Sequence, residues 1–228
     1  MRTHLGSICL FAALAALTTF PVGAQQSPRI VYTFEHPQLN PAKYTITIDE
    51  NGGGHFVSVP GAVSTDYQDN VFPAPVDRDI RLDDKLRADL FTYARAHQFF
   101  GEHCDRGKSG LAFTGNKSFT YSGSDGKGTC AFVWAGDPIL QRLADQLNAV
   151  AFTIEIGRRL EVEVRHDRLG LDSELEGLQD AVKDQRASDL PNIASDLQTI
   201  AEDRQVMDRV RKRALALLSR CESDQKPN

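Results

Sequence analysis

The chain has 228 residues, 41% of them hydrophobic, and a formal net charge of −5 at pH 7. This length is enough for a sizeable core, in one domain or in a domain with an appendage. The excess of acidic residues argues against a nucleic-acid-binding protein, so we expect no nucleic-acid partner.

Residues 1–24 predict a cleaved secretory signal. Arg2 precedes an apolar run from Leu5 to Phe20, and the small residues Gly23 and Ala24 stand where a signal peptidase cuts. The run is too short to span a bilayer comfortably, and no later stretch has about 18 uninterrupted apolar residues. We therefore expect cleavage near Ala24, export to the periplasm or beyond, and no transmembrane segment.

Two strand patterns follow the signal. A first strand is predicted by apolar residues that alternate with polar ones, at Ile30, Tyr32 and Phe34. Residues 44–48 alternate strictly, Asn51 and Gly52 favour a tight turn, and residues 56–59 alternate again. This pattern predicts a hairpin that pairs Ile46 with Val57 and Tyr44 with Val59.

A long polar connection follows this hairpin. From Pro60 to Pro75 the sequence is rich in Gly, Ser, Asp, Asn and Pro and has little periodicity, which predicts a surface loop. We expect this loop to bind a partner through Asp66, Asp69 and Asn70. These residues could also suggest calcium, but their spacing lacks the alternating ligands and closing glutamate of an EF-hand. We therefore expect no calcium site.

The next segment predicts a short edge strand over residues 79–82 and a helix, capped by Asp83 or Asp84, that runs to about Gln98. Beyond it, His97, His103 and Cys104 form the tightest cluster of histidine and cysteine in the chain. Zinc or copper uses such ligands, but no second cluster supplies a third and a fourth. We therefore expect no metal centre.

A second hairpin is predicted at the centre of the chain. Asp125 and Gly126 favour a type I′ turn, which tolerates positive φ angles. Counting outward from this turn predicts three opposed pairs: Tyr121 with Cys130, Phe119 with Phe132, and Lys117 with Trp134. A further strand containing Leu111 and Phe113 extends the same apolar face. We expect this aromatic face, Trp134 included, to be buried under the helix that follows.

Three cysteines remain after signal cleavage. Cys104 lies just beyond a predicted helix and Cys130 lies on the predicted hairpin, so we expect these two to form a disulfide in an oxidising compartment. Cys221 is then the odd cysteine. Near the end of an amphipathic helix, it is expected to act as a small buried hydrophobe.

The remainder of the chain predicts helices. Asp137 followed by Pro138 is typical of a helix start, and apolar residues then recur at spacings of three and four. Residues 158–168 fit either a helix or a strand, and we interpret them as helix. After a break near Gly170, Ser173 and Glu176 fit a capping box, and two short antiparallel helices end the chain.

These patterns together predict an α+β fold. Small antiparallel hairpins, or a meander, pack against helices over residues 25–136, and a helical region over residues 137–228 packs on them, with short helices after residue 172. The signal occupies residues 1–24.

No residue pattern in the chain predicts catalysis or a cofactor. No serine or cysteine has the context of a known nucleophile, and sequence neighbours such as His166 and Asp167 point about 100° apart on a helix. We therefore expect an exported, noncatalytic protein that binds a protein or a cell-envelope component through its loops. The alternative is a hydrolase or metal-dependent enzyme whose site assembles from dispersed residues, which are His55, His97, His103 and His166 with nearby acids.

Overall fold

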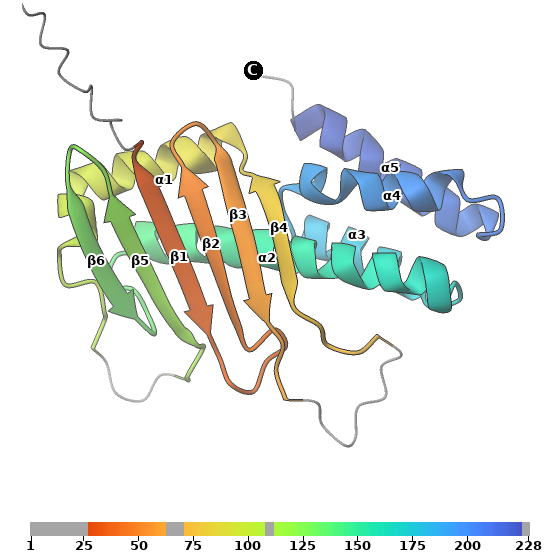
Figure 1. Ribbon diagram of the computed structural model, residues 1–228, viewed down its shortest axis with the longest axis horizontal. Helices are drawn as coiled ribbons and strands as arrows, with labels where there is room; N and C mark the ends of the chain where they lie inside the picture. The colour runs from red at the N-terminus through yellow and green to blue at the C-terminus, as the bar shows by residue number, and fades with distance from the viewer. Residues whose placement is uncertain (1–26, 63–70, 108–111, 225–228) are drawn as a thin grey trace, which may run out of the picture.

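A computed structural model describes residues 27–62, 71–107 and 112–224 of the chain. It is an α+β fold in which an antiparallel sheet of six strands packs against helices, with further helices at the C-terminal end (Figure 1). The predicted fold class is thereby confirmed. The predicted signal at residues 1–24 lies outside the described residues.

The strands lie in the order β4-β3-β2-β1-β5-β6. Their bounds are β1 Arg29–Glu35, β2 Lys43–Asp49, β3 Gly53–Val59, β4 Val76–Arg81, β5 Asn116–Ser122 and β6 Lys127–Phe132. β1 to β4 form a meander, and the β5–β6 hairpin joins this meander through β1. Apolar residues alternate along the strands, so one face of the sheet is buried and the other is left to water.

Two of the helical elements, α1 and α2, cover the buried face. The complete set is α1 Asp84–Ala96, η1 Gln98–Phe100, α2 Pro138–His166, α3 Leu171–Lys183, η2 Leu190–Ile193, α4 Ala194–Glu202 and α5 Asp208–Asp224. In Figure 1, α1 and α2 lie behind the sheet, while α3 to α5 gather beyond the β4 edge. Within the described residues, no element covers the opposite face of the sheet.

Helix α2, 29 residues long, is shared by two hydrophobic cores. Its first half packs Leu140, Leu147 and Ile154 against the sheet and α1. Its second half packs Ile156 and Leu160 against α3, α4 and α5. Residues 158–166 are therefore helical, as interpreted from the sequence, because the apolar stripe continues into the second core.

A polar contact lies between α2 and the centre of the sheet. Asn148 Oδ1 accepts hydrogen bonds from the hydroxyls of Tyr32, at 2.7 Å, and Tyr44, at 2.6 Å. Both tyrosine rings are buried, and burial raises the pKa of both hydroxyls. The buried hydroxyls thus have an acceptor, which removes the cost of leaving them unpaired and fixes α2 on β1 and β2.

The predicted register of the central hairpin is wrong by two residues. Phe119 lies opposite Cys130, and Tyr121 lies opposite Gly128. The turn is centred on Ser124 and Asp125 rather than on Asp125 and Gly126, because Gly123 N bonds to Gly126 O and Ser122 lies opposite Lys127. A slip of two residues keeps each side chain on its face, so Phe119 and Tyr121 are still buried, as expected.

Gly126 and Gly128 have a packing role that the turn prediction missed. Residues 98–100 form a left-handed turn, with φ of 57° at Phe99, and this turn lies against the hairpin. A Cβ on Gly126 would overlap the Phe99 ring, and a Cβ on Gly128 would overlap the Phe99 carbonyl oxygen. The two glycines are therefore required by close approach rather than by a positive φ angle.

The expected extension of the aromatic face is also wrong. Trp134 lies beyond the end of β6 and is half-buried, and its Nε1 donates to the carbonyl of Ala112 at 2.8 Å. Phe113 lies outside any strand and is exposed, while Leu111 lies outside the described residues. Lys117 instead occupies the inner face of β5, opposite Phe132.

The β2–β3 register differs from the prediction by one residue. Ile46 lies opposite Phe56 and Tyr44 lies opposite Ser58, because the connection from Asp49 to Gly53 is longer than a two-residue turn. A slip of one residue exchanges the faces of a strand. Phe56 and Ser58 are therefore buried, whereas Val57 and Val59 face water.

The C-terminal helices agree with the prediction except at one boundary. Helix α3 begins at Leu171 with Gly170 in the N-cap position, so the expected capping box of Ser173 and Glu176 is wrong. Leu171 is fully buried in the second core, which favours starting the helix three residues earlier than the capping box would.

Cys104 and Cys130 lie at disulfide distance, with Cα atoms 6.0 Å apart. This pair connects the segment after η1 to β6. Cys221 lies elsewhere, buried on α5 in the second core, which agrees with the role of a small hydrophobe.

The close approach of the left-handed turn to the hairpin predicts that alanine at Gly128 is destabilising, and Gly177, on α3, provides a control. Gly128→Ala should lower the free energy of unfolding by about 2 kcal/mol, because the new methyl group displaces the Phe99 backbone. Gly177→Ala, at an exposed position of α3 with no atom near its Cβ, should raise it by about 0.5–1 kcal/mol. Urea unfolding of both variants measures the difference. Equal stability of the two variants would contradict the assigned contact.

Candidate functional site

Four exposed apolar side chains lie at one end of the sheet, and we call them the loop-end surface: Leu39, Val59, Phe72 and Phe113. Their exposed fractions are 48%, 53%, 69% and 50%. Single exposed apolar residues are ordinary, but a group from several loops is typical of an interaction surface.

The antiparallel topology places these residues at the same end. β1 and β3 both run towards this end, and β4 and β5 both start from it. Leu39 lies in the connection after β1, Val59 ends β3, Phe72 precedes β4 and Phe113 precedes β5. These connections lie together at the lower end of the sheet in Figure 1.

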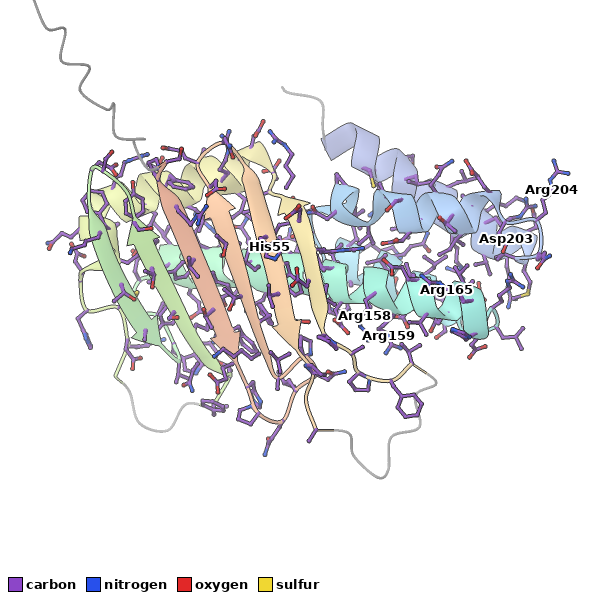
Figure 2. All side chains as sticks on the ribbon, viewed as in Figure 1. His55, Arg158, Arg159, Arg165, Asp203 and Arg204 are labelled. Atoms are coloured by element: carbon purple, nitrogen blue, oxygen red, sulfur yellow. A yellow bond between two sulfur atoms is a disulfide. The ribbon has the colours of Figure 1, made fainter. Side chains whose placement is uncertain are left out.

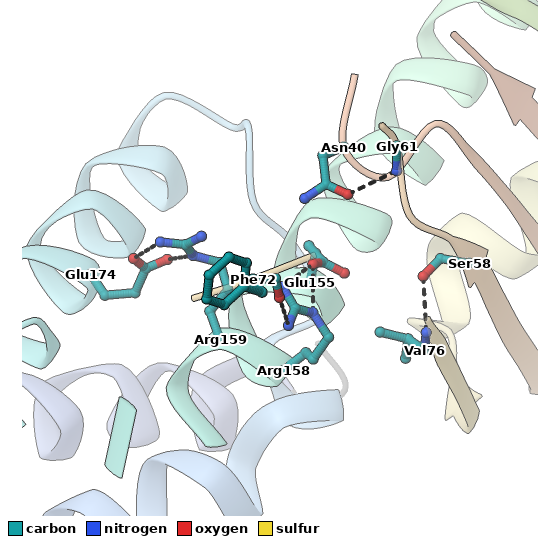
Figure 3. A network of polar contacts seen from close by, with 9 residues as sticks. All are labelled: Asn40, Ser58, Gly61, Phe72, Val76, Glu155, Arg158, Arg159 and Glu174. Carbon is teal, nitrogen blue, oxygen red and sulfur yellow. Dashed lines mark hydrogen bonds and ion pairs between the residues drawn. The ribbon is translucent and has the colours of Figure 1, made fainter. Parts of the chain in front are cut away.

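Phe72 is exposed, yet its backbone is held by a buried side chain. Arg158 Nη1, on α2, donates to the Phe72 carbonyl at 3.2 Å (Figure 3). Close by in the same connection, the Val76 amide donates to the buried hydroxyl of Ser58 at 3.1 Å. The chain that presents Phe72 is therefore fixed on both α2 and β3.

Arg158 is positioned by a buried ion pair. Its Nε donates to Glu155 Oε1 at 2.6 Å, and both residues are less than 10% exposed. Burial raises the pKa of Glu155, and the positive charge of Arg158 opposes this rise. The next residue, Arg159, makes a two-pronged contact with Glu174 of α3, at 2.8 and 3.0 Å (Figure 3). This part of α2 thus holds both the loop and the next helix.

Leu39 and Val59 lie on connections that are bonded to each other. The Gly61 amide donates to Asn40 Oδ1 at 3.2 Å, and the Ala42 amide donates to the Val59 carbonyl at 3.0 Å. The connection after β1 is therefore fixed against the end of β3, which restricts the positions of the two exposed side chains.

Phe113 is supported by a ring contact and by a buried lysine nearby. Its ring lies 5.0 Å from that of His36 in the β1–β2 connection. Lys117 is 3% exposed, and its Nζ donates to the carbonyls of Gly115 and Val133, at 3.2 and 3.0 Å. Burial lowers the pKa of this ammonium group. Through these backbone carbonyls, the ammonium group fixes the segment leading into β5.

The residues predicted to bind a partner, Asp66, Asp69 and Asn70, lie outside the described residues. They belong to the same connection as Phe72, between β3 and β4. The sequence analysis overlooked Phe72 because it considered only the polar residues of this loop. A large aromatic residue in an otherwise polar connection was the signal that could have identified it.

The histidines of the enzyme alternative are dispersed. His55 lies on the open face of the sheet, and His166 is exposed at the end of α2. His97 and His103 share a cavity of about 200 Å³ beside Cys104 and Cys130, where His97 stacks on Tyr93 at 4.1 Å. Among the described residues, no three His, Cys, Asp or Glu side chains are placed to hold a metal ion.

His55, on the open face of the sheet (Figure 2), belongs to a local charge cluster. Its Nδ1 lies 2.8 Å from Asp79 and its Nε2 lies 3.0 Å from Asp77, both on the neighbouring strand β4. The hydrogen bond with Asp79, followed by the charge of Asp77, raises the pKa of His55. Both carboxylates are largely exposed, so this cluster belongs to the solvated face of the sheet.

No protein-family model matches the chain, and no curated protein matches it significantly. In the part of the chain that the structure describes, no helix combines the length and apolar character needed to cross a bilayer.

The buried ion pair predicts a strong coupling between its two residues. Arg158→Met should lower the free energy of unfolding by about 3 kcal/mol, because Glu155 then keeps a buried charge without its partner. The double variant Glu155→Met, Arg158→Met should cost clearly less than the sum of the two single variants. A double-mutant cycle in urea measures this coupling. Strict additivity would show that the pair is not coupled.

The His55 cluster predicts a titration above the ordinary range. By NMR, the imidazole should titrate with a midpoint above about 6.5, and Asp79→Asn should bring that midpoint down. Because the folded state holds the proton more tightly, the contribution to stability is complete below the unfolded pKa and is lost as pH rises through the folded one. A midpoint at or below about 6.5 would contradict the assigned contacts.

Proposed function

We propose that the protein is exported and noncatalytic, and that it binds a protein or another cell-envelope component through the loop-end surface. The observation that carries this proposal is the combination of exposed apolar tips with anchored backbones. Loops held rigid before binding lose less conformational entropy when a partner docks, so a small apolar surface binds more tightly. Asp66, Asp69 and Asn70, in the same connection as Phe72, supply polar contacts in this proposal.

Several other features support binding rather than catalysis. Of the four histidines proposed for an enzyme, His97 and His103 line one cavity, whereas His55 lies on β3 and His166 ends α2. The cations Arg209, Arg211, Lys212 and Arg213 of α5 are paired with carboxylates, which disfavours an anionic partner at that helix. The cysteine pair at disulfide distance supports an oxidising compartment.

Serine substitutions on the loop-end surface test the proposal. Phe72→Ser and Phe113→Ser should each change the free energy of unfolding by less than about 1 kcal/mol, because both side chains are exposed. The double variant should fail to retain a partner that the wild type retains from an envelope extract. Leu169→Ser is the matched control, because Leu169 is 78% exposed in the turn between α2 and α3.

A photoreactive amino acid at position 72 or at position 169 identifies the contact directly. Position 72 should crosslink to the retained partner, and position 169 should not. Retention of the partner by the double serine variant, with crosslinking from position 169 alone, would refute the loop-end assignment.

A further inference from the structure

The turn between α1 and the cysteine pair has a strained backbone. Its three residues, Gln98, Phe99 and Phe100, have φ angles of 49°, 57° and 66°, and none of them is a glycine. In this left-handed region the Cβ of a residue is crowded against the backbone, so that even one bulky residue is uncommon there. Strain of this kind persists only where the surrounding structure holds it, and it is often found at switch regions.

Ring packing holds the turn on one side. Phe100 is buried, and its ring stacks on that of Phe119 with the centroids 5.0 Å apart. The Phe99 ring lies 4.9 Å from that of Tyr121. The turn therefore forms a side wall of the core that lies between the sheet and helices α1 and α2.

The cysteine pair holds the turn on the other side. Residues 101–103 alone separate the turn from Cys104, and its partner Cys130 is fixed within β6. Beyond this pair, the Gly136 amide donates to the Cys104 carbonyl at 2.8 Å. Because the tether is so short, the turn cannot rotate to negative φ angles without moving Cys104 away from β6.

The cysteine pair can be reached by a reductant. Both cysteines line the cavity of about 200 Å³ described above, and two other lining residues, Glu102 and His103, are exposed, so the cavity reaches the solvent. Cys130 is buried, whereas Cys104 is only partly buried. The Sγ atom of Cys104 is therefore the sulfur that an incoming thiolate reaches first.

We propose that the Cys104–Cys130 bridge is a redox-sensitive clamp on this wall of the core. When a dithiol reduces the bridge, the strained turn at Gln98–Phe100 unwinds, and the segment that follows it separates from β6. The clamp is independent of the proposed function, because it does not require the loop-end surface to bind a partner.

One dithiol accounts for all the atoms and electrons of the reduction. A thiolate of the dithiol attacks Cys104 Sγ to form a mixed disulfide, and the electron pair of the broken S–S bond leaves with Cys130, which takes up a proton. The second sulfur of the dithiol, also as a thiolate, then displaces Cys104, which is protonated in turn. The products are two cysteine thiols and the disulfide form of the dithiol.

Amide hydrogen exchange with and without dithiothreitol tests the proposal on the full chain. Peptide mapping without reduction should first show the bridge between Cys104 and Cys130. In the reduced protein, the amides of Gly101 and Gly136 should exchange at least tenfold faster, because their acceptors, the carbonyls of Gln98 and Cys104, move away. The amides of α4, in the second core, should exchange at the same rate in both states.

Cysteine variants separate the bridge from other effects of the reductant. The double variant Cys104→Ser, Cys130→Ser should show the fast exchange with or without dithiothreitol. Cys221→Ser is the matched control, because Cys221 is a free cysteine in the second core, and this variant should respond as the wild type does.

Two substitutions of Gln98 test whether strain in the turn favours opening. In the reduced protein, the Gly136 amide should exchange about fivefold more slowly in Gln98→Gly than in Gln98→Ala, because glycine adopts a positive φ angle without crowding. Both variants lack the side-chain hydrogen bond from Gln98 to Glu102, so the comparison isolates the backbone.

Four outcomes would overturn the proposal. They are a mapped protein without the bridge, a reduced protein that exchanges at the oxidised rates, equal exchange in the glycine and alanine variants, and faster exchange that extends to α4. The last of these would show that reduction unfolds the whole chain rather than one wall of the core.

Discussion

The packing of α2 against the sheet is the contact on which the rest of the structure depends. One helix supplies apolar side chains to both hydrophobic cores, so neither core is complete without it. Its position on the sheet is fixed by apolar burial and by the hydrogen bonds from two buried tyrosines to Asn148. Where α2 extends beyond the sheet, it carries the helical part of the molecule with it (Figure 1).

The polar residues of α2 gather where the helix passes from one core to the other. Glu155 and Arg158 form a buried pair that fixes the Phe72 loop, and Arg159 binds Glu174 of α3. Buried ion pairs contribute little net stability, since desolvation offsets their attraction, but they specify geometry. Here they determine how the loop and α3 sit on α2, which apolar packing alone would leave less defined.

Part of each edge of the sheet is occupied by other segments of the chain. At the β4 edge, the side-chain amide of Asn192 bonds to the backbone N–H and C=O of Arg81. Beyond β6, Asp105 bridges to Ala135, and the turn at Phe99 lies against the hairpin. These contacts shorten the stretches at which a further strand could pair, which favours a partner at loops or at a sheet face.

The sequence by itself determined the elements and their class. Alternation of apolar residues identified β1, β2 and β3. Asp137 marked the start of α2, either Asp83 or Asp84 marked that of α1, and the approach of Cys104 to Cys130 followed from their positions in the predicted elements. These are local signals, because a helix cap or an alternating run of apolar residues can be recognised from neighbouring residues alone.

Only the tertiary structure decided the registers and the sites. The registers depend on the true length and position of each turn. Gly126 is required because the Phe99 ring, 27 positions away in the chain, leaves no room for a Cβ. The loop-end surface combines residues from four separate segments, and the ion pairs of Arg78 with Glu161 and Asp196 join β4, α2 and α4. No spacing in the sequence encodes such meetings, because they arise from the long-range packing of α2 on the sheet and of α4 on α2.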